Sequence, residues 1–273
     1  MPELPEVENV RQGLSIQVEG RTITHVDVLW ANIIKDPSVE EFKKQLENQT
    51  IHQVGRRGKF LLFYLTDYTL ISHLRMEGKY TLVPTPSDFQ LHTHIVFHLD
   101  NGEDMRYMDV RKFGRMSLVE KGQEENHPSL SKLGPEPVRE EFKIDAMTAR
   151  LQKHKKAIKA VLLDQSMVVG IGNIYADEIL FEAGILPTRP SDSLTNQERK
   201  KLYEAIIEIM NRAVELGGTT VRSYKNSFGE EGTYQKYLRV YGKNKKECPR
   251  CHQTIQKAKV AQRGTHFCLG CQK

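Results

Sequence analysis

The sequence of 273 residues lacks any apolar run of the roughly 18 to 20 residues that a membrane-spanning helix requires. Its acidic, proline-containing N-terminal stretch has neither the basic nor the apolar region of a signal peptide. These absences argue against a helical membrane protein and predict a location in the cytosol. A hydrophobic content of 38% is enough for ordinary cores, and the length suits two modest domains.

Acidic residues are nearly missing from the C-terminal segment. Residues 232–273 hold ten Lys and Arg against one acidic residue, Glu247, which gives a net charge of +9. The other 231 residues hold 30 basic and 34 acidic side chains, which gives −4. Concentrated positive charge suits a segment that binds a polyanion, because each neutralised phosphate releases condensed counterions. A solvated charged tail is the alternative.

The N-terminal stretch MPELPE combines a proline with two carboxylates. If Met1 is removed, the chain begins with the secondary amine of Pro2, and an α-amino group with an ordinary pKa of about 7.7 to 8.0 is partly unprotonated near neutral pH. Such an amine can attack an aldehyde-like carbon and form an iminium, with Glu3 and Glu6 as proton carriers. Alternatively, the proline only rigidifies a tail with two solvated glutamates.

The periodicity of the first 130 residues predicts a β-rich domain. Helices are expected at VENVRQGL (7–14) and SVEEFKKQLEN (38–48), with a strand at 22–29 between them. Residues 51–120 are mostly β in pattern, and the DNG turn between two alternating segments indicates a hairpin. We expect a β-sandwich or barrel, with the three cations of GRRGK (55–59) in a turn where they could reach a phosphate.

Proline and glycine are dense in LGPEPVREEF (133–142), after which the hydrophobic period changes from two to about 3.6. We therefore expect a hinge there, followed by helices at 144–153 and 155–165. A third helix is expected behind the GIG turn, with Asn173 as its N-cap and free N–H groups that could approach a phosphate. No strand precedes this GIG and the third glycine of a dinucleotide fingerprint is absent, which argues against a Rossmann site.

Two further segments follow this helical pattern. TNQE (195–198) is a capping box that opens a long helix ending at Gly217 and Gly218. The next segment, 219–238, is polar with glycines and scattered aromatics, and it predicts a surface loop, either functional or simply disordered.

All four cysteines lie in the basic C-terminal segment, spaced C-x2-C-x16-C-x2-C. This spacing predicts a tetrahedral zinc site, with disulfides or redox chemistry as the alternatives. The zinc would be structural, because four thiolates leave no position for a substrate. Two alternating segments between the cysteine pairs predict a hairpin with Arg263 at its tip, a shape suited to gripping a DNA backbone. The predicted ligands are Cys248, Cys251, Cys268 and Cys271.

Several motifs occur together and in order: MPELPE, the RRGK turn, HLRMEGKY, DVRKFG, LGPEP, VVGIGNIYADE and AQRGTHFCLGCQK. In this combination, which spans residues 2–273, the chain resembles the bacterial formamidopyrimidine-DNA glycosylases, which repair 8-oxoguanine. The resemblance implies a multi-domain α+β protein with an N-terminal β-sandwich flanked by helices, a helix-two-turn-helix domain and a C-terminal four-cysteine zinc-finger β-hairpin. The expected divisions are 1–132 for the catalytic sandwich, 133–142 for the hinge, 143–222 for the helical domain, 223–243 for the lesion-recognition loop and 244–273 for the zinc finger.

The resemblance also implies a mechanism. The Pro2 amine would attack the anomeric carbon of an oxidised purine nucleotide, displace the base and form an iminium with the sugar. Glu3 would protonate the ring oxygen, Lys59 would assist at the lesion and its phosphate, and β,δ-elimination would cut the strand on both sides. The damaged nucleotide must first be extruded from the duplex, at an unstacking cost of a few kcal/mol.

The remaining site residues are also implied by the resemblance. Met76, Arg111 and Phe113 would fill the gap in the duplex, and the arginine would read the orphaned cytosine. Asn173 and Arg263 resemble phosphate clamps on either side of the lesion, and Arg263 joins Pro2, Glu3 and Lys59 in the expected catalytic set. Expected further DNA contacts are His92 and Lys155, and expected lesion-recognition residues are Glu77, Glu178, Thr219, Thr220 and Tyr224.

The expected partner is duplex DNA with an oxidised purine opposite cytosine, the expected cofactor is one structural Zn²⁺, and we expect a monomer associated with the bacterial nucleoid. Two alternatives remain open. Endonuclease VIII-like enzymes, which act on oxidised pyrimidines, share the terminal proline, the helical unit and the zinc finger, although they typically begin PEGPE. A non-catalytic protein that binds damaged or bent DNA would keep the scaffold, and retention of Met1 would favour it.

Overall fold

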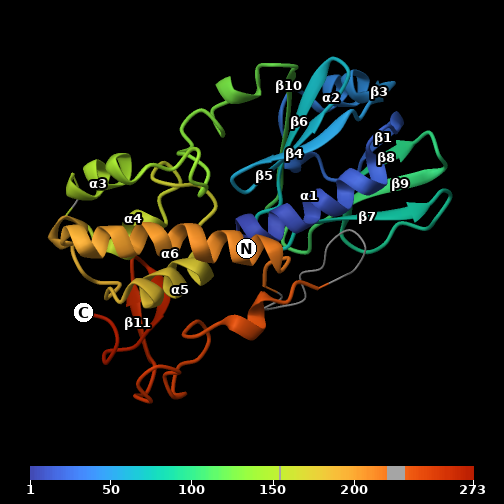
Figure 1. Cartoon of the computed structure of the whole chain (residues 1–273). Helices are drawn as coiled ribbons and strands as arrows, with labels where there is room; N and C mark the ends of the chain where they lie inside the picture. The colour runs from blue at the N-terminus through green and yellow to red at the C-terminus, as the bar shows by residue number, and fades with distance from the viewer. Residues whose placement is uncertain (154, 220–230) are drawn as a thin grey trace. The chain divides into compact units, whose positions relative to one another are not determined.

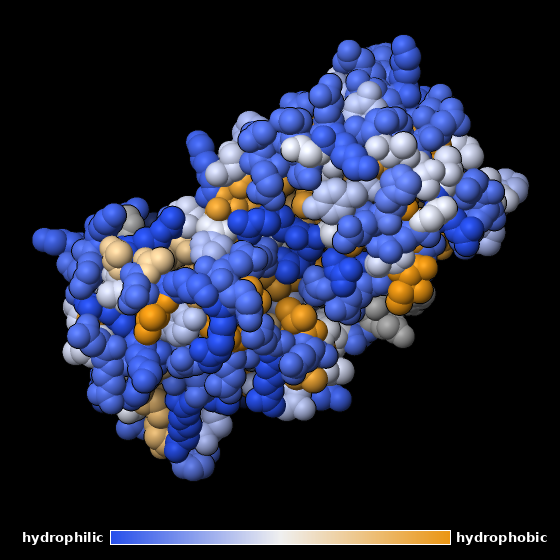
Figure 2. Space-filling model, turned by 45° about the horizontal axis from the view of Figure 1, so that its top comes forward, coloured by the Kyte–Doolittle hydropathy of each residue, from blue (hydrophilic) through white to orange (hydrophobic). Residues whose placement is uncertain are grey.

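The computed structural model describes residues 1–153, 155–219 and 231–273, and the chain forms two compact units (Figure 1). The first unit is made of Met1–Ser131 and Thr219–Gly232, and the second of Lys132–Gly218 and Thr233–Lys273. No helix in the described ranges is both long enough and apolar enough to cross a membrane. The face drawn in Figure 2 is mostly hydrophilic, with hydrophobic side chains in small separate patches.

The first unit contains two five-stranded sheets, in the orders β3-β1-β8-β9-β7 and β2-β10-β6-β5-β4. All neighbouring strands are antiparallel except β2 and β10. One hydrophobic core draws on both sheets, and the Phe63 ring of β5 lies 5.5 Å from the Tyr80 ring of β7. The expected N-terminal sandwich is confirmed. Its strands are β1 (Thr22–Val28), β2 (Ile34–Asp36), β3 (Gln49–Thr50), β4 (Gln53–Arg57), β5 (Phe60–Tyr64), β6 (Tyr68–His73), β7 (Lys79–Pro84), β8 (Thr93–Leu99), β9 (Glu103–Met108) and β10 (Arg115–Glu120).

Two α-helices accompany the sandwich, and both agree with the hydrophobic periodicity. Helix α1 (Leu4–Val18) lies against β4 and buries Val10 and Leu14 (Figure 1). Helix α2 (Val39–Leu46) opens with a capping box in which the Ser38 Oγ accepts a hydrogen bond from the Glu41 N–H at 3.3 Å. Two short 3-10 helices complete the unit, η1 (Ala31–Ile33) and η2 (Glu124–Asn126).

The second unit is helical, apart from one hairpin. Its longest helix, α6, packs against α5 (Figure 1). The helix expected over 155–165 is shorter than predicted, because its regular backbone covers five residues only. The elements are α3 (Ile144–Gln152), α4 (Ile158–Leu162), α5 (Asn173–Ala183), η3 (Ser191–Ser193), α6 (Asn196–Glu215), η4 (Tyr234–Tyr237), β11 (Gln256–Val260) and β12 (Arg263–Phe267).

Helix ends in this unit follow local chemistry. The capping box at the start of α6 is confirmed, since the Glu198 Oε2 accepts the Thr195 N–H at 2.8 Å. The expected N-cap of α5 is wrong, because Gly172 caps this helix and Asn173 is its first helical residue. Extended backbone at Gly172 (φ −128°, ψ −154°) supplies the cap conformation, which leaves the Asn173 side chain available for another partner.

Turn residues differ from the prediction at two hairpins. In the first unit, Arg56 and Arg57 belong to β4, and the β4–β5 turn consists of Gly58, at φ +55°, and Lys59. In the second unit, Arg263 is not at the tip of its hairpin. The tip is Ala261 and Gln262, whose φ angles of +50° and +60° suit a two-residue turn, and Arg263 opens β12 opposite Val260.

Candidate functional site

Pro2 and Glu3 lie at the buried beginning of α1 in the first unit. Glu3 is 2% exposed, and its N–H donates to the Glu6 Oε2 at 2.7 Å. This bond crosses the first turn of the helix and fixes the backbone directly behind Pro2. An amine released at Pro2 would therefore belong to a rigid segment, which is a requirement for orienting a nucleophile.

The second oxygen of Glu6 holds a segment from far along the chain. The Glu6 Oε1 accepts the Thr219 N–H at 2.7 Å and the Thr219 hydroxyl at 3.0 Å. Glu6 thus accepts hydrogen bonds from backbone or hydroxyl donors with both carboxylate oxygens, which makes it an anchor, and its role as a proton carrier stays a prediction. Thr219 is buried beside the N-terminal helix. Two other expected lesion contacts, Thr220 and Tyr224, lie outside the described residues.

Lys59 occupies the β4–β5 turn and is 6% exposed. Arg56 ties this turn to α1, because its Nη1 donates to the Gly58 carbonyl at 2.9 Å and its Nε donates to the Glu8 Oε2 at 3.0 Å. Burial acts to raise the pKa of the Glu8 carboxyl, but hydrogen bonds from Arg11 and Arg56 outweigh burial and lower the pKa below its ordinary value. An ionised Glu8 therefore keeps Arg56 in place, and with it the turn that carries Lys59.

The surroundings of Lys59 are cationic. Burial, followed by the positive charges of Arg75, Lys59 and Arg115, lowers the pKa of His73 from 6.5 to about 3. His73 is therefore neutral near pH 7, and its Nδ1 accepts the Arg75 N–H at 2.9 Å. A group of cations around a neutral imidazole is suited to an anion such as a DNA phosphate.

Two turns of the sandwich expose the expected gap-filling side chains. Met76 is 37% exposed and Phe113 is 49% exposed, although large apolar side chains are usually buried. The guanidinium carbon of Arg111 lies 4.7 Å from the centre of the Phe113 ring, which is a cation–π contact. Glu77 is exposed beside Met76, and His92 is partly exposed at a positive φ of 67° just before β8.

In the second unit, the two expected phosphate clamps are neighbours. The Asn173 Nδ2 donates to the Gly264 carbonyl at 3.0 Å, and Gly264 directly follows Arg263. Arg263 itself is exposed. The first turn of α5 and the start of β12 are therefore joined where both expected clamps lie. Lys155 is exposed just before α4.

A buried ion pair, which sequence reasoning missed, supports the clamp region. The Lys159 Nζ lies 2.6 Å from the Asp177 Oδ1 and donates to the Thr265 hydroxyl at 2.7 Å, and both charged side chains are fully buried. The other oxygen, Asp177 Oδ2, accepts the His266 N–H at 2.8 Å. This cluster connects α4, α5 and β12. The sequence does show a charged residue among the apolar residues of each helix, Lys159 in α4 and Asp177 in α5. This pattern does not reveal that the two residues pair with each other.

Glu178 is buried next to Asp177 on α5. It accepts the backbone N–H groups of Arg239, Val240 and Tyr241 at 2.8 to 3.0 Å. Burial raises the pKa of Glu178 above its ordinary value. The three N–H donors act to lower this pKa, and the negative charge of Asp177 acts to raise it. Glu178 also lines a cavity of about 140 Å³ with Tyr234. Its visible function is to anchor the segment that leads to the cysteines, and its contact with a lesion stays a prediction.

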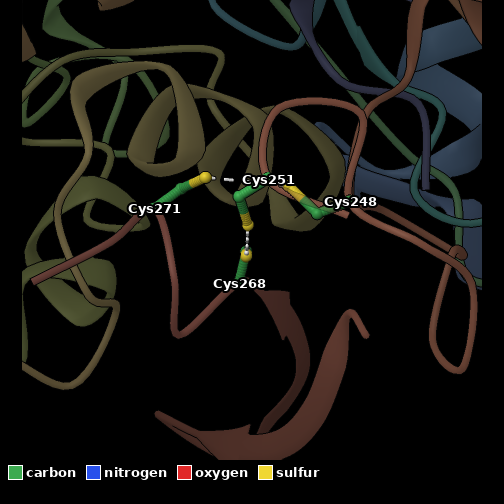
Figure 3. Close-up of side chains that lie close together, drawn as sticks. All are labelled: Cys248, Cys251, Cys268 and Cys271. Carbon is green, nitrogen blue, oxygen red and sulfur yellow. Dashed lines mark hydrogen bonds between the residues drawn. The ribbon is translucent and has the colours of Figure 1, made fainter. Parts of the chain in front are cut away.

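The four cysteine sulfurs converge (Figure 3). The Cys251 and Cys268 sulfurs are 3.4 Å apart, the Cys248 and Cys271 sulfurs are 3.7 Å apart, and all four lie within 4.8 Å of one another. These separations exceed the roughly 2.05 Å of a disulfide. They fit a tetrahedral ion with zinc–sulfur bonds of about 2.3 Å, which places the sulfurs about 3.8 Å apart.

The environment of the cysteines shifts their pKa values in opposite directions. Burial, with the neighbouring thiols, raises the pKa of Cys271 to about 12, whereas burial at Cys248 is outweighed by hydrogen bonds that lower its pKa to about 7. Four adjacent thiols resist shared ionisation, and a bound dication overcomes this by stabilising the thiolates. The donor set therefore fits zinc, as the spacing predicted.

Comparison with known proteins covers the whole chain. Three family models match in order: "Formamidopyrimidine-DNA glycosylase N-terminal domain" at residues 1–116, "Formamidopyrimidine-DNA glycosylase H2TH domain" at 133–225, and "Zinc finger found in FPG and IleRS" at 245–273. The chain is 52% identical over 273 residues to a formamidopyrimidine-DNA glycosylase of Enterococcus faecalis, with 100% of this chain and 98% of the relative covered. It is 50% identical over 274 residues to that of Bacillus licheniformis, with 100% of both chains covered.

Solved structures of Lactococcus lactis Fpg agree with these matches. One, a complex with DNA containing an abasic site, is similar with a TM-score of 0.94 and 41% identity over 99% of both chains. Another, a complex with DNA containing N7-benzyl-Fapy-dG, has a TM-score of 0.94 and 41% identity over 100% of both chains. The resemblance found in the sequence and the expected enzyme class are thereby confirmed. The chain belongs to the formamidopyrimidine-DNA glycosylase family of base-excision repair enzymes.

Proposed function

We propose that this protein excises oxidised purines, namely 8-oxoguanine and formamidopyrimidines, from duplex DNA and then cuts the strand at the resulting abasic site. The observation that carries the proposal is the buried pair Pro2 and Glu3 at the start of α1, where the Glu6 carboxylate accepts the Glu3 N–H. The DNA complexes of Lactococcus lactis Fpg with abasic and Fapy-dG sites support the choice of substrate. The substrate implies action on bacterial chromosomal DNA in the cytoplasm.

The first stage replaces one bond to the sugar by another. After Met1 is removed, the lone pair of the Pro2 amine attacks C1′ of the damaged nucleotide, and the bond from C1′ to the base breaks with its electron pair leaving on the base. The bound amine nitrogen gives its N–H proton to Glu3, and Glu3 passes this proton to the sugar ring oxygen, so that the ring opens and a Pro2 iminium remains, while the departing base takes a proton from water. The cations around Lys59 stabilise the adjacent phosphate while charge shifts at the sugar.

The second stage cuts the strand. The iminium acidifies C2′, loss of a C2′ proton breaks the C3′–O bond, and a second elimination breaks the C5′–O bond. Water then releases the sugar fragment and restores the amine. Arg263 and Asn173 would hold the flanking phosphates, and Met76, Arg111 and Phe113 would occupy the space of the extruded nucleotide. Through Arg111 we propose a preference for cytosine opposite the lesion, and we propose that the protein acts as a monomer.

We further propose that the four cysteines hold one structural zinc ion. Bound zinc would stabilise the fold of the β11–β12 hairpin and take no part in the reaction, since four thiolates complete its coordination. The hairpin would then keep Arg263, at the turn end of β12, in position for a phosphate. Metal analysis of the purified protein should give one zinc per chain.

The test is a borohydride trap with duplex DNA carrying 8-oxoguanine opposite cytosine, followed by peptide mapping of the covalent adduct. We expect the cross-link at Pro2 on a chain that has lost Met1. Pro2→Gly should nearly abolish excision while DNA affinity is retained, and Pro5→Ala, which changes the other proline of the same stretch, should still be trapped.

Three other outcomes would reject the proposal in different ways. Normal excision by Pro2→Gly would exclude Pro2 as the nucleophile. An adduct with an oxidised pyrimidine, but not with 8-oxoguanine, would assign the chain the specificity of endonuclease VIII-like enzymes. Tight binding of both duplexes without any adduct would leave a protein that only binds damaged DNA.

A further inference from the structure

The turn that follows β9 exposes its side chains to solvent, while buried groups hold its backbone. Val110 is 59% exposed and Phe113 is 49% exposed, and Arg111 is exposed between them. Lys112 adopts a positive φ of 56°, which side-chain-bearing residues adopt rarely. A turn with exposed apolar side chains and an uncommon backbone angle requires a specific internal support.

Asp109 supplies that support. It is 1% exposed, its Oδ1 accepts the Arg111 N–H at 3.0 Å, and its Oδ2 accepts the Phe113 N–H and the Gly114 N–H, each at 2.8 Å. Within the described residues, the Asp109 carboxylate is bonded only to these backbone groups. The carboxylate therefore specifies the conformation of the turn, because its two oxygens together accept three N–H groups from both sides of Lys112.

The backbone of Asp109 connects the same turn to the segment before β8. Its N–H donates to the His92 carbonyl at 3.1 Å, and its carbonyl oxygen lies 2.7 Å from the His94 Nε2. His92, an expected DNA contact, and the Arg111 and Phe113 turn are thus held by one residue. A shift of the Asp109 backbone would therefore move both segments.

The turn that carries Met76 shares a support with this one. A Cβ atom on Gly114 would lie 1.7 Å from the Tyr107 hydroxyl oxygen, and a Cβ atom on Gly78 would lie 2.2 Å from it. A side chain at either position would therefore clash with the Tyr107 hydroxyl, so both positions require glycine. The Met76 turn and the Arg111 turn consequently meet on Tyr107, two residues before Asp109, and form one platform.

We propose that Asp109 is a positioning residue for the gap-filling step, which sets the geometry of Arg111 and Phe113 so that they replace the extruded nucleotide and read the opposite base. This inference rests on the proposed function, because it concerns how the same site handles duplex DNA. Asp109 does not touch the reacting atoms. It acts through the turn, so its effect is confined to substrates in which a gap in a duplex has to be filled.

The test compares Asp109→Asn with Asp104→Asn. Asparagine keeps the size of aspartate but presents an NH2 group to at least one of the backbone donors, which breaks the pattern of acceptors. Asp104 is the control, since it is also buried, at 2% exposure, but lies near the start of β9, far from the turn, and pairs with Arg106. The readouts are single-turnover excision from duplexes with the lesion opposite cytosine or adenine, and borohydride trapping on single-stranded abasic DNA.

For Asp109→Asn we expect a loss of about 10- to 100-fold in duplex excision, as misplaced positioning groups typically cause. Its preference for cytosine over adenine opposite the lesion should shrink, while trapping on single-stranded abasic DNA should stay within about 2-fold of the unmodified protein, because no gap exists there. Asp104→Asn should retain the opposite-base preference, whatever it loses in thermal stability.

The outcomes separate this inference from the proposed function. If the unmodified protein excises the lesion and Asp109→Asn keeps its rate and its base preference, the positioning role is rejected. Equal losses on duplex and single-stranded DNA would also reject it, because they indicate general damage to the fold. Gly114→Ala, which moves the same turn without changing a charge, is the second test, and an unchanged base preference in that variant would likewise reject the positioning role. If the unmodified protein traps on neither DNA, the proposed function itself fails.

Discussion

Asp109 in the first unit and Asp177 in the second are both almost completely buried, and each is bonded to backbone close to an exposed arginine. The partners of the two carboxylates differ in charge. Asp177 faces the ammonium group of Lys159 at 2.6 Å, whereas the described partners of the Asp109 carboxylate are backbone N–H groups. The ion pair specifies which elements meet, namely α4, α5 and β12. The N–H groups around Asp109 specify how one turn is shaped.

This difference teaches where each unit is sensitive. Removing one member of a buried ion pair leaves an uncompensated charge, so the second unit should lose stability. Replacing the Asp109 carboxylate, whose described partners are all N–H groups, leaves no charge behind, so this change should alter mainly the geometry of Arg111 and Phe113. The predictions below test this contrast.

The largest expected effect comes from Lys159→Met. It leaves the Asp177 carboxylate buried without its cation, and we expect a loss of about 3 to 5 kcal/mol in the free energy of unfolding, measured by urea denaturation. Lys155→Met, which removes an exposed lysine at the start of the same segment, is the control and should change stability little. A loss no greater than that of the control would mean that the ion pair does not hold the three elements together.

An intermediate effect is expected from replacing the two arginines in turn. Arg263→Ala should weaken DNA binding similarly for all sequences and reduce the slope of the logarithm of affinity against the logarithm of salt concentration by about 1, as for a lost phosphate contact. Arg111→Ala should leave that slope nearly unchanged but reduce the preference for cytosine opposite the lesion. Binding titrations at several salt concentrations measure both, and identical slopes for the two variants would contradict the assigned roles.

The smallest expected effect concerns Glu198 at the start of α6. Hydrogen bonds from Arg189, with those from Thr195, lower the pKa of Glu198 from 4.5 to about 2 despite its partial burial. A lowered pKa means that its stabilisation is complete above pH 4.5 and disappears as the pH falls through about 2. Glu198→Gln should therefore cost roughly 0.5 to 1 kcal/mol near pH 7, and the difference from the unmodified protein should shrink in acid.

Thermal or urea unfolding between pH 7 and pH 2 checks this expectation. Glu204→Gln on the same helix is the matched control, because its ion pair with Arg139 is exposed and weakened by solvent. A stability difference for Glu198→Gln that stayed constant over this pH range would mean that ionisation of Glu198 contributes nothing.

Local chemistry explains what the sequence could predict. The capping box at Thr195 and the alternating strands are each encoded within a few residues and are confirmed, and the two C-x2-C pairs converge into one cluster of four sulfurs as their spacing predicted. The prediction for the β4–β5 hairpin was wrong about which residues form the turn. Gly58 with Lys59 suffices to turn the β4–β5 hairpin, so Arg56 stays in its strand.

Long-range partners explain most of what the sequence could not predict. Glu6 bonds to Thr219 across 213 positions, and Lys159 bonds to Thr265 across 106 positions, and neither pairing has a periodic signature. Asp109 is a different case. An aspartate two residues before a turn arginine is a local signal of side-chain bonding to backbone N–H groups, and that signal was available in DVRKFG.

The bond between Glu6 and Thr219 has a consequence for the order of events on the ribosome. The first unit is interrupted after Ser131 and resumes at Thr219, 88 positions later. At a synthesis rate of about 5 to 20 residues per second, that interval lasts roughly 4 to 18 seconds. During this time the sandwich can fold around its core, but the Glu6 Oε1 has not yet gained its hydrogen bonds, because Thr219 has not yet been synthesised. The segment next to Pro2, the proposed nucleophile, therefore reaches its final arrangement only after most of the second unit has been synthesised.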